Sequence, residues 1–358
     1  MRYKLSEICE YVKEKIEVSK LNKKIYISTE NMLPNRGGVT LASSLPTVNQ
    51  TQSFKREDVL ISNIRPYFKK IWHANFEGGC SNDVLVMRAK EGIDTRFLYY
   101  VLSNDDFFDY SMSTSKGTKM PRGDKKSLME YEVPQFKYEE QIKMASMLSK
   151  LDDKIQLNNN INKNLEQQVF ALFDASFPDI INGENIIGEL ITPKRGKSLL
   201  SKEAILGNIP VVAGGLEPST YHNISNTQAP VVTISASGAN AGFVNLWNIP
   251  VWSSDSSFID NSITPYVFFW YVMLKKRQKE IFDAQTGSAQ PHIYPKHIAE
   301  MPISDVSEKR IYSFETQVSL FFNLIGKNKN ESLRLSEIRD FLLPKLISGE
   351  IDVSNIDF

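Results

Sequence analysis

Cysteine is scarce in this chain, whose 358 residues include only Cys9 and Cys80. Two cysteines cannot build a disulfide framework or a zinc site, so we expect a reducing compartment, the cytoplasm. Long apolar runs are missing too: no stretch reaches about 18 apolar residues, so no membrane span is expected. The first stretch, "MRYKLSEICEYVKEKIEV", is amphipathic and lacks the apolar core of a secretory signal.

An excess of charge of either sign is also lacking. The chain has 42 basic and 42 acidic residues, which gives a formal net charge of zero. This balance offers no global support for binding to nucleic acid. At 41% apolar and 23% charged residues, the composition is that of an ordinary globular protein. The chain is too long for one ordinary core, so we expect two domains.

Catalytic and metal-binding motifs are absent from the sequence. An adenine methyltransferase needs an Asn/Asp-Pro-Pro-aromatic motif and a Gly-rich cofactor loop, and neither occurs. "KRGKSL" (194–199) resembles the end of a phosphate-binding loop, but the first glycine of that motif would fall at Ile191. His292 and His297 have no cysteine or acidic cluster near them to complete a zinc site. We therefore expect no catalytic residue and no metal site.

The sequence does contain an internal repeat with an offset of about 170 residues. The order of features is the same in both halves: Ser-rich β segments, a Gly-containing loop, a Val-Pro or Met-Pro exit and a long helix. One pairing places Asp83 opposite Asp255. The matching segments are 61–72 with 234–247, 80–86 with 252–259, 116–134 with 286–302, and 155–165 with 325–335. The chain is a duplicated unit.

Each half ends in a long helical stretch with an apolar seam at heptad spacing. The seam residues are Leu148, Leu151, Ile155, Asn158, Asn162, Leu165, Val169 and Leu172, then Val318, Phe321, Ile325, Asn328, Ser332, Leu335, Arg339 and Leu342. Polar layers recur at equivalent seam positions, and an Asn there fixes register at a cost in stability. We expect antiparallel pairing that brings Asn158 near Asn328. The alternative is that each helix packs only on its own domain.

The remaining parts have the pattern of mixed α/β domains. "DVLVMRA", "APVVTISAS" and "IPVWSS" are β-branched runs bounded by turns, which predicts strands. Residues 95–110 and 264–282 are predicted helices that start at Thr95 and Thr264, with Pro265 in the first turn. The last helix contains Pro344, which should bend it, and Gly349, which should end it in the left-handed conformation. The tail that follows should lie against the first domain.

Several of these features together resemble the specificity subunit of type I restriction–modification systems. They are the duplicated unit, "EEQIKMASMLSKLDDKI…NLEQQVFALF" (139–173), "TGSAQPHIYPKHIAEMPI" (286–303) and "LLPKLISGEI" (342–351). The resemblance spans essentially the whole chain. It implies an α+β fold with two similar mixed α/β target-recognition domains, separated by two long helices in an antiparallel coiled coil, with internal pseudo-twofold symmetry. The implied boundaries are 1–136 and 179–303 for the recognition domains, 137–178 for the central helix, and 304–358 for the last helix and tail.

The resemblance also implies a function. Each recognition domain would read half of a bipartite site in double-stranded DNA, and the chain would direct its partners to that site without catalysing a reaction. The implied partners are two methyltransferase subunits and, in the full complex, restriction subunits. No cofactor is implied for this chain; the methyltransferase would bind S-adenosylmethionine, and the restriction subunit ATP and Mg. The first repeat departs from the family pattern at "GTKMPRGD", and the second helix at "SDVSEKRIYSFETQ".

Local basic clusters are where such a protein would hold DNA, beside Gly and polar residues that let the backbone approach phosphates. The expected DNA-binding residues are Arg65, Lys69, Lys70, Lys116, Lys119, Arg122, Lys125, Lys194, Arg195, Lys197, Asn240, Gln290, His292 and Lys296. Arg and Lys read guanine, and Asn and Gln read adenine. The candidates for base contacts are therefore Arg65, Arg122, Asn240 and Gln290. The expected coiled-coil contacts are Leu151, Ile155, Asn158, Leu165, Phe321, Ile325, Asn328 and Leu335.

Other interpretations remain open at this point. Each basic cluster could be an ordinary solvated surface. A duplicated coiled-coil protein with no net charge could also be a protein–protein scaffold without DNA readout of its own. A degenerate enzyme is a third possibility, which the missing motifs disfavour.

Overall fold

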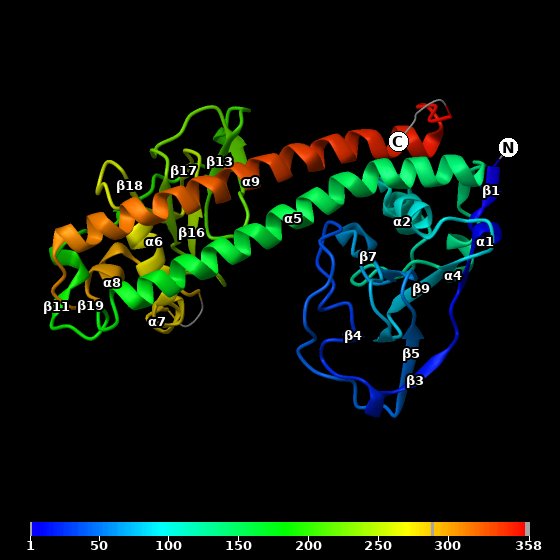
Figure 1. Ribbon diagram of the computed structural model, residues 1–358, viewed down its shortest axis with the longest axis horizontal. Coiled ribbons are helices and arrows are strands. Elements are labelled where there is room, and N and C mark those ends of the chain that lie inside the picture. The colour runs from blue at the N-terminus through cyan, green and yellow to red at the C-terminus, as the bar shows by residue number, and fades with distance from the viewer. Residues whose placement is uncertain (1, 288–289, 355–358) are drawn as a thin grey trace. The chain divides into compact units, whose positions relative to one another are not determined.

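The computed structural model in Figure 1 describes residues 2–287 and 290–354. Their contacts divide the chain into two compact units. Unit 1 comprises the residues up to Ile155 and those from Leu333 onward, and unit 2 is Gln156–Ser332. Two long helices, α5 (Tyr138–Ser176) and α9 (Glu308–Ser348), contribute residues to both units.

Unit 1 is built from short strands and short helices in addition to its parts of α5 and α9. The strands are β1 (Arg2–Lys4), β2 (Cys9–Tyr11), β3 (Lys15–Glu17), β4 (Tyr26–Ile27), β5 (Gln50–Phe54), β6 (Val59–Ser62), β7 (Ile71–His73), β8 (Gly78–Cys80), β9 (Val84–Ala89) and β10 (Glu132–Pro134). The helices are α1 (Leu5–Ile8), α2 (Thr95–Ser103), α3 (Asp105–Ser113) and α4 (Lys125–Leu128). One sheet has the order β2-β9-β6-β7, a second has the order β3-β5-β8-β4, and β1 pairs with β10.

Unit 2 has the same kinds of elements. Its strands are β11 (Asn185–Ile186), β12 (Lys194–Arg195), β13 (Ile209–Val212), β14 (Thr220–His222), β15 (Val231–Ser235), β16 (Val244–Trp247), β17 (Trp252–Ser253), β18 (Ser256–Asp260) and β19 (Pro302–Ile303). Its helices are α6 (Val267–Lys276), α7 (Gln278–Asp283) and α8 (Pro295–Ala299).

The two units repeat one connectivity. The sheet β12-β18-β15-β16 corresponds strand by strand to β2-β9-β6-β7, and both are antiparallel. The parallel pair β13 and β17 corresponds to β4 and β8, and β11–β19 corresponds to β1–β10. Helices follow in the same order in both units. The predicted fold class, with two similar mixed α/β domains, is confirmed.

The predicted helix boundaries are partly wrong. Residues 95–110 form two helices that break at Asn104, and residues 264–282 break at Arg277. α2 begins at Thr95 as predicted, but α6 begins at Val267, so Pro265 precedes the helix. Thr264 is held in the turn after β18, where its N–H donates to the Asp260 carbonyl. Its hydroxyl accepts the N–H of Tyr266 and therefore closes this turn.

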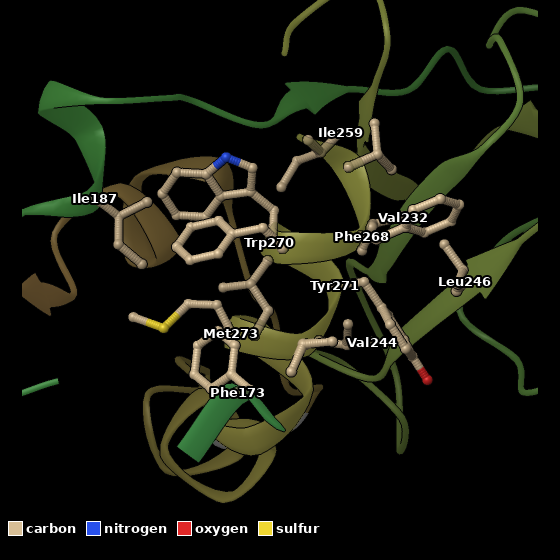
Figure 2. Packing of buried hydrophobic residues seen from close by; sticks show 14 of the residues in the cluster. Phe173, Ile187, Val232, Val244, Leu246, Ile259, Phe268, Trp270, Tyr271 and Met273 are labelled. Atoms are coloured by element: carbon tan, nitrogen blue, oxygen red, sulfur yellow. The ribbon is translucent and has the colours of Figure 1, made fainter. Parts of the chain in front are cut away.

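The core of unit 2 surrounds α6, whose residues from Val267 to Leu274 are all buried. Figure 2 shows Trp270 and Phe268 pointing from α6 in different directions, toward Ile187 and toward Val232 of β15. Phe173 of α5 packs on Phe269, with 5.8 Å between ring centroids. A helix that is apolar on all sides can exist in water only when other elements cover it. Each fully buried large side chain stabilises the unit by about 1.5–3 kcal/mol.

The end of α9 belongs to the core of unit 1. Leu343, Leu346 and Ile347 are buried there, and Gly349 has a φ of +79°, the left-handed conformation predicted for the residue that ends the helix. The tail continues along unit 1: Val353 is buried in the same core, and Lys143 donates to the carbonyl of Ser354 at 2.8 Å. The tail thus lies against unit 1, as the sequence predicts, up to Ser354.

α5 and α9 run antiparallel where they meet inside each unit (Figure 1). In unit 2 the Arg310 guanidinium donates to the Ser176 carbonyl, and Asn158 lies against Asn328. In unit 1 the Arg339 guanidinium pairs with Asp152 at 2.8 Å. All of the expected coiled-coil residues are buried or half-buried, namely Leu151, Ile155, Asn158, Leu165, Phe321, Ile325, Asn328 and Leu335.

The polar layer contains a hydrogen-bonded group. The Asn158 side-chain amide donates to Glu331 at 2.8 Å and approaches the Asn328 carbonyl at 3.5 Å. Asn328 in turn donates to Asn162 at 2.8 Å. Since these bonds form only in one alignment of the two helices, the layer favours that register.

Candidate functional site

Three segments of unit 1 that are far apart in sequence meet at one end of its sheets. They are the loop between β6 and β7 (63–70), the turn before β9 (81–83) and the loop before α4 (116–122). The Asn63 N–H donates to the Asp83 carbonyl at 2.8 Å, and the Arg65 N–H to the Pro121 carbonyl at 2.8 Å. Ile64 and Arg122 form a β-bridge. We call these three segments site 1.

The loop 116–122 is a small hairpin that presents its basic side chains outward. Lys116 and Arg122 exchange backbone hydrogen bonds of 2.9 and 3.0 Å. The Lys116 side chain is 82% exposed and pairs with Asp124 at 2.6 Å; the Arg122 side chain is 51% exposed and pairs with Asp83 at 3.3 Å. Lys119 is exposed in the loop, and Lys125 is exposed at the start of α4.

Asp124 anchors this hairpin to α4. It accepts the N–H groups of Lys126 and Ser127, which caps the helix. The hydrogen bond from Lys116, with those from the backbone, holds the pKa of Asp124 well below its usual range. The carboxylate is therefore charged at neutral pH and fixes the direction of α4 without any contribution from the Lys119 or Arg122 side chains.

The loop 63–70 carries three basic residues with different environments. Lys69 pairs with Asp105 of α3 at 2.7 Å, and Lys70 donates to the Thr29 carbonyl at 2.6 Å. Burial lowers the pKa of Lys70. Burial would raise the pKa of Asp105, but the hydrogen bonds from Lys69 and Arg36 outweigh it and the pKa is lowered. Lys69 and Lys70 thus tie the loop to the rest of unit 1.

Unit 2 builds the same framework from its own segments, which we call site 2: residues 236–243, 254–255, 286–287 and 290–292. The Ala236 N–H donates to the Asp255 carbonyl, and the Gly238 N–H to the Pro291 carbonyl, both at 3.0 Å. Ser237 and His292 form the β-bridge that Ile64 and Arg122 form in site 1. Each backbone bond of site 1 given above therefore has its counterpart in site 2.

The side chains of site 2 are different from those of site 1. His292 occupies the place of Arg122 and stacks on Tyr294, with 5.9 Å between ring centroids and 15° between planes. Asn240 is half-buried in its loop and Gln290 is exposed. Arg195 of β12 pairs with Asp255 at 2.5 Å, so this predicted residue also reaches the site. Site 2 thus offers amide and imidazole groups and fewer basic side chains than site 1.

Not all of the predicted residues gather at these sites. The Lys194 side chain extends away from site 2 toward Ser262, beyond the opposite end of β18. Lys296 is exposed on α8 and pairs with Glu300 at 3.4 Å. Lys197 is exposed, and its N–H donates to the Ser253 carbonyl close to Asp255. Lys194 and Lys296 are thus peripheral, while Lys197 borders site 2.

Sequence reasoning missed several residues at the sites. Tyr67 and Phe68 are 48% and 38% exposed in the loop of site 1, and Tyr294 is 46% exposed beside site 2. Asp83 and Asp255 were aligned with each other in the repeat, but their role in holding the neighbouring cations was not predicted. An aromatic pair inside the basic stretch "RPYFKK" was a signal that could have been used, because exposed rings can stack on bases.

The arrangement supplies hydrogen-bond donors, amides and exposed rings to a ligand. Within residues 2–287 and 290–354, no group of three or more His, Cys, Asp or Glu side chains could hold a metal ion. In the same part of the chain, no helix is long and apolar enough to cross a membrane. Cationic side chains beside open backbone suit a polyanion, and Arg, Asn and Gln can also read base edges.

Comparisons with known proteins agree on one family. Residues 1–167 match the family model described as type I restriction modification DNA specificity domain. The chain is 25% identical over 310 residues to the type I restriction enzyme MjaIX specificity subunit of Methanocaldococcus jannaschii, covering 75% of this chain and 71% of the relative. It is 23% identical to the HindI specificity subunit of Haemophilus influenzae, covering 98% of this chain and 99% of the relative.

A solved structure supports the fold along the whole chain. The crystal structure of the type I restriction–modification S subunit from M. genitalium superposes with a TM-score of 0.60 at 20% sequence identity. The superposition covers 99% of this chain and 96% of that one.

Proposed function

Since the chain belongs to the specificity-subunit family of type I restriction–modification systems, we propose that sites 1 and 2 are its two DNA-reading surfaces. Each would bind half of a bipartite site in double-stranded DNA. The recognition domains would be residues 1–136 and 179–303, joined by the long helices. The chain would thereby select the sequence on which the complex acts.

One observation carries this proposal: the two sites share a backbone framework and differ in their side chains. Arg65, Arg122 and Lys116 occupy the places of Gly238, His292 and Thr286, while the backbone bonds around them are the same. A protein that reads two different half-sequences with one docking geometry needs this combination. A constant backbone sets the position on the duplex, and variable side chains read the bases.

We assign different roles to the side chains according to their exposure. Lys116 and Lys119 suit phosphate contacts because they are exposed point charges on flexible stems. Arg65, Arg122, Asn240 and Gln290 suit base contacts in the major groove. Arg195, Lys197 and His292 would complete the surface of site 2, and Lys125 that of site 1.

The chemistry would reside in partner subunits. Two methyltransferase subunits would bind S-adenosylmethionine, and restriction subunits would bind ATP and Mg. The neutral net charge of this chain fits a subunit whose partners complete the grip on DNA, and such a complex would act in the cytoplasm. The purified chain with S-adenosylmethionine and DNA should transfer no methyl group. Methyl transfer without any partner would refute this division of roles.

The alternative is a scaffold that joins partners but reads no DNA. Measurement of the affinity for duplex DNA over a series of salt concentrations distinguishes the DNA-reading subunit from the scaffold. It compares the methyltransferase partner alone with the complex of that partner and this chain. A DNA-reading subunit should add affinity and steepen the fall of log K with log salt by about 0.9 per phosphate contact. If the affinity and the slope are the same with and without this chain, the chain is a scaffold that reads no DNA.

A further inference from the structure

The loops 63–70 and 236–243 have the same length and share the backbone hydrogen bond that closes them. Ser62 N–H donates to the Lys70 carbonyl, and Ser235 N–H to the Phe243 carbonyl, both at 3.0 Å. Both loops also have left-handed residues at their third and seventh positions. In unit 2 these are Gly238 and Gly242, with φ of +81° and +86°. In unit 1 they are Arg65 and Lys69, with φ of +50° and +51°.

Glycine is the unstrained residue for such a position, because the Cβ of any other residue crowds the backbone in the left-handed region. At Gly238 a Cβ would meet nothing within 4 Å, so local crowding by neighbours does not dictate the choice. Unit 2 therefore uses the relaxed solution at both positions. Unit 1 instead has two cationic residues, Arg65 and Lys69, in the strained conformation. The strain must be offset by an interaction that each of these residues makes.

The strained loop of unit 1 is held in place by its neighbours. Asn35 and Arg36, themselves left-handed with φ of +53° and +61°, donate their N–H groups to the Phe68 and Lys69 carbonyls, both at 2.9 Å. A surrounding structure that enforces unfavourable backbone angles is typical of functional sites.

Lys69 has a structural reason for its place, since it pairs with Asp105 of α3. Arg65 has none: among the residues that the structure describes, its side chain makes no hydrogen bond or ion pair. Its Nε is buried without a partner. By contrast, Arg122 beside it is paired with Asp83. A buried N–H donor without a partner is a costly arrangement for folding alone.

We propose that Arg65 reads a guanine in the half-site bound by unit 1, an inference that rests on the proposed function. The planar guanidinium matches the O6 and N7 acceptors of guanine in the major groove with two hydrogen bonds. The strained backbone fixes the direction of the side chain before DNA arrives. Unit 2, with Gly238 at this place, has no such contact.

The test replaces Arg65 by the residue that unit 2 uses. The complex with the methyltransferase is prepared with wild-type chain, Arg65→Gly, Arg65→Lys, and Glu57→Gly, which makes the same left-handed-to-glycine change outside site 1. The methylated site is read for each complex by sequencing modified DNA. Thermal unfolding of each chain is measured in parallel.

Arg65→Gly should keep or raise the unfolding midpoint, because it removes backbone strain and, among the described residues, no hydrogen bond or ion pair. The methylated site should keep every position but one, where guanine loses its preference over other bases by about 5- to 150-fold. Arg65→Lys should relax the same position less than Arg65→Gly, because a lysine donates to guanine as a point charge without the planar fork of arginine, and it should retain the salt dependence of binding. Glu57→Gly should leave the methylated site unchanged.

Three results would overturn the inference. One is an unchanged base preference in Arg65→Gly. Another is uniformly weaker binding to all sequences, which would make Arg65 a phosphate contact. The third is a lower unfolding midpoint in both Arg65 variants together with loss of all recognition, which would make the residue structural. If the wild-type complex itself methylates no specific sequence, the proposed function fails, and this inference with it.

Discussion

The exposed hairpin of site 1 allows a quantitative test of DNA contact. We consider the triple variant Lys116→Ala, Lys119→Ala and Arg122→Ala. The backbone bonds between residues 116 and 122 hold the hairpin without these side chains, and Asp124 still caps α4 through the N–H groups of Lys126 and Ser127. The variant should therefore fold normally, because the ion pairs that it loses are at the surface and contribute little to stability.

The expected change lies in the salt dependence of binding. Each lysine or arginine on a phosphate contributes a slope of about −0.9 to log K against log salt. With Lys116 and Lys119 on phosphates, the variant should lose about 2 units of slope, rising to at most about 3 if Arg122 also contacts a phosphate, and it should bind all sequences more weakly. The assay is equilibrium binding of the complex to duplex DNA at four or more salt concentrations.

A matched control removes the same number of charges elsewhere on unit 1. Lys20, Lys23 and Lys24 are exposed and precede β4, which runs parallel to β8. Since Asp83 follows the end of β8, these lysines lie at the opposite end of that sheet. Their triple Ala variant should change the slope little. An equal loss of slope in both variants, or none in the hairpin variant, would refute site 1 as a phosphate-binding surface.

Three further predictions concern the scaffold that holds the sites. Asn158→Leu should raise the unfolding midpoint, because Asn158 is fully buried and its Oδ1 has no partner; a midpoint several degrees lower would contradict this. Burial raises the pKa of Glu315 to about 7, although the backbone hydrogen bonds from Phe268 and Phe269 oppose this shift. The protonated Glu315 therefore contributes its full stabilisation of the folded state below about pH 4.5, and this contribution is lost as the pH rises through about 7. The free energy of unfolding of Glu315→Gln, relative to that of the wild type, should therefore rise by about 3 kcal/mol between these pH values. Denaturant unfolding at each pH measures this, and the exposed Glu337→Gln should show no such rise. Gly349→Ala should cost about 1 kcal/mol in thermal unfolding because of the left-handed φ, and the neighbouring Ser348→Ala should cost less than about 0.5 kcal/mol.

Much of the fold could be predicted from the periodicity and the internal repeat of the sequence. The heptad seam predicted two long helices, and the offset of about 170 residues predicted two similar domains. Gly349 predicted where α9 ends, because few residues other than glycine readily adopt the left-handed conformation that ends a helix. These features depend on local chemistry or on patterns that extend over many turns, so one sequence is enough to find them.

The details of the sites depended on contacts between distant segments. Nothing in the sequence indicated that Lys69 would be bound by Asp105 while Arg65 would have no partner, since α3 and the loop meet only in the folded unit. Lys194 was predicted at a site on charge alone, yet its side chain extends in the opposite direction. Thr264 was predicted to start a helix, but it lies in a turn in which its N–H donates to the Asp260 carbonyl. Tertiary contacts overrode local preference in each case.

The central claim is that this chain selects the DNA sequence on which its complex acts. The most direct measurement is sequencing of methylated adenine across the genome of a host with and without the gene. We predict a methylated bipartite site, two short specific sequences separated by a spacer of fixed length, that disappears when the gene is deleted. Identical methylation at every site in both strains would contradict the account.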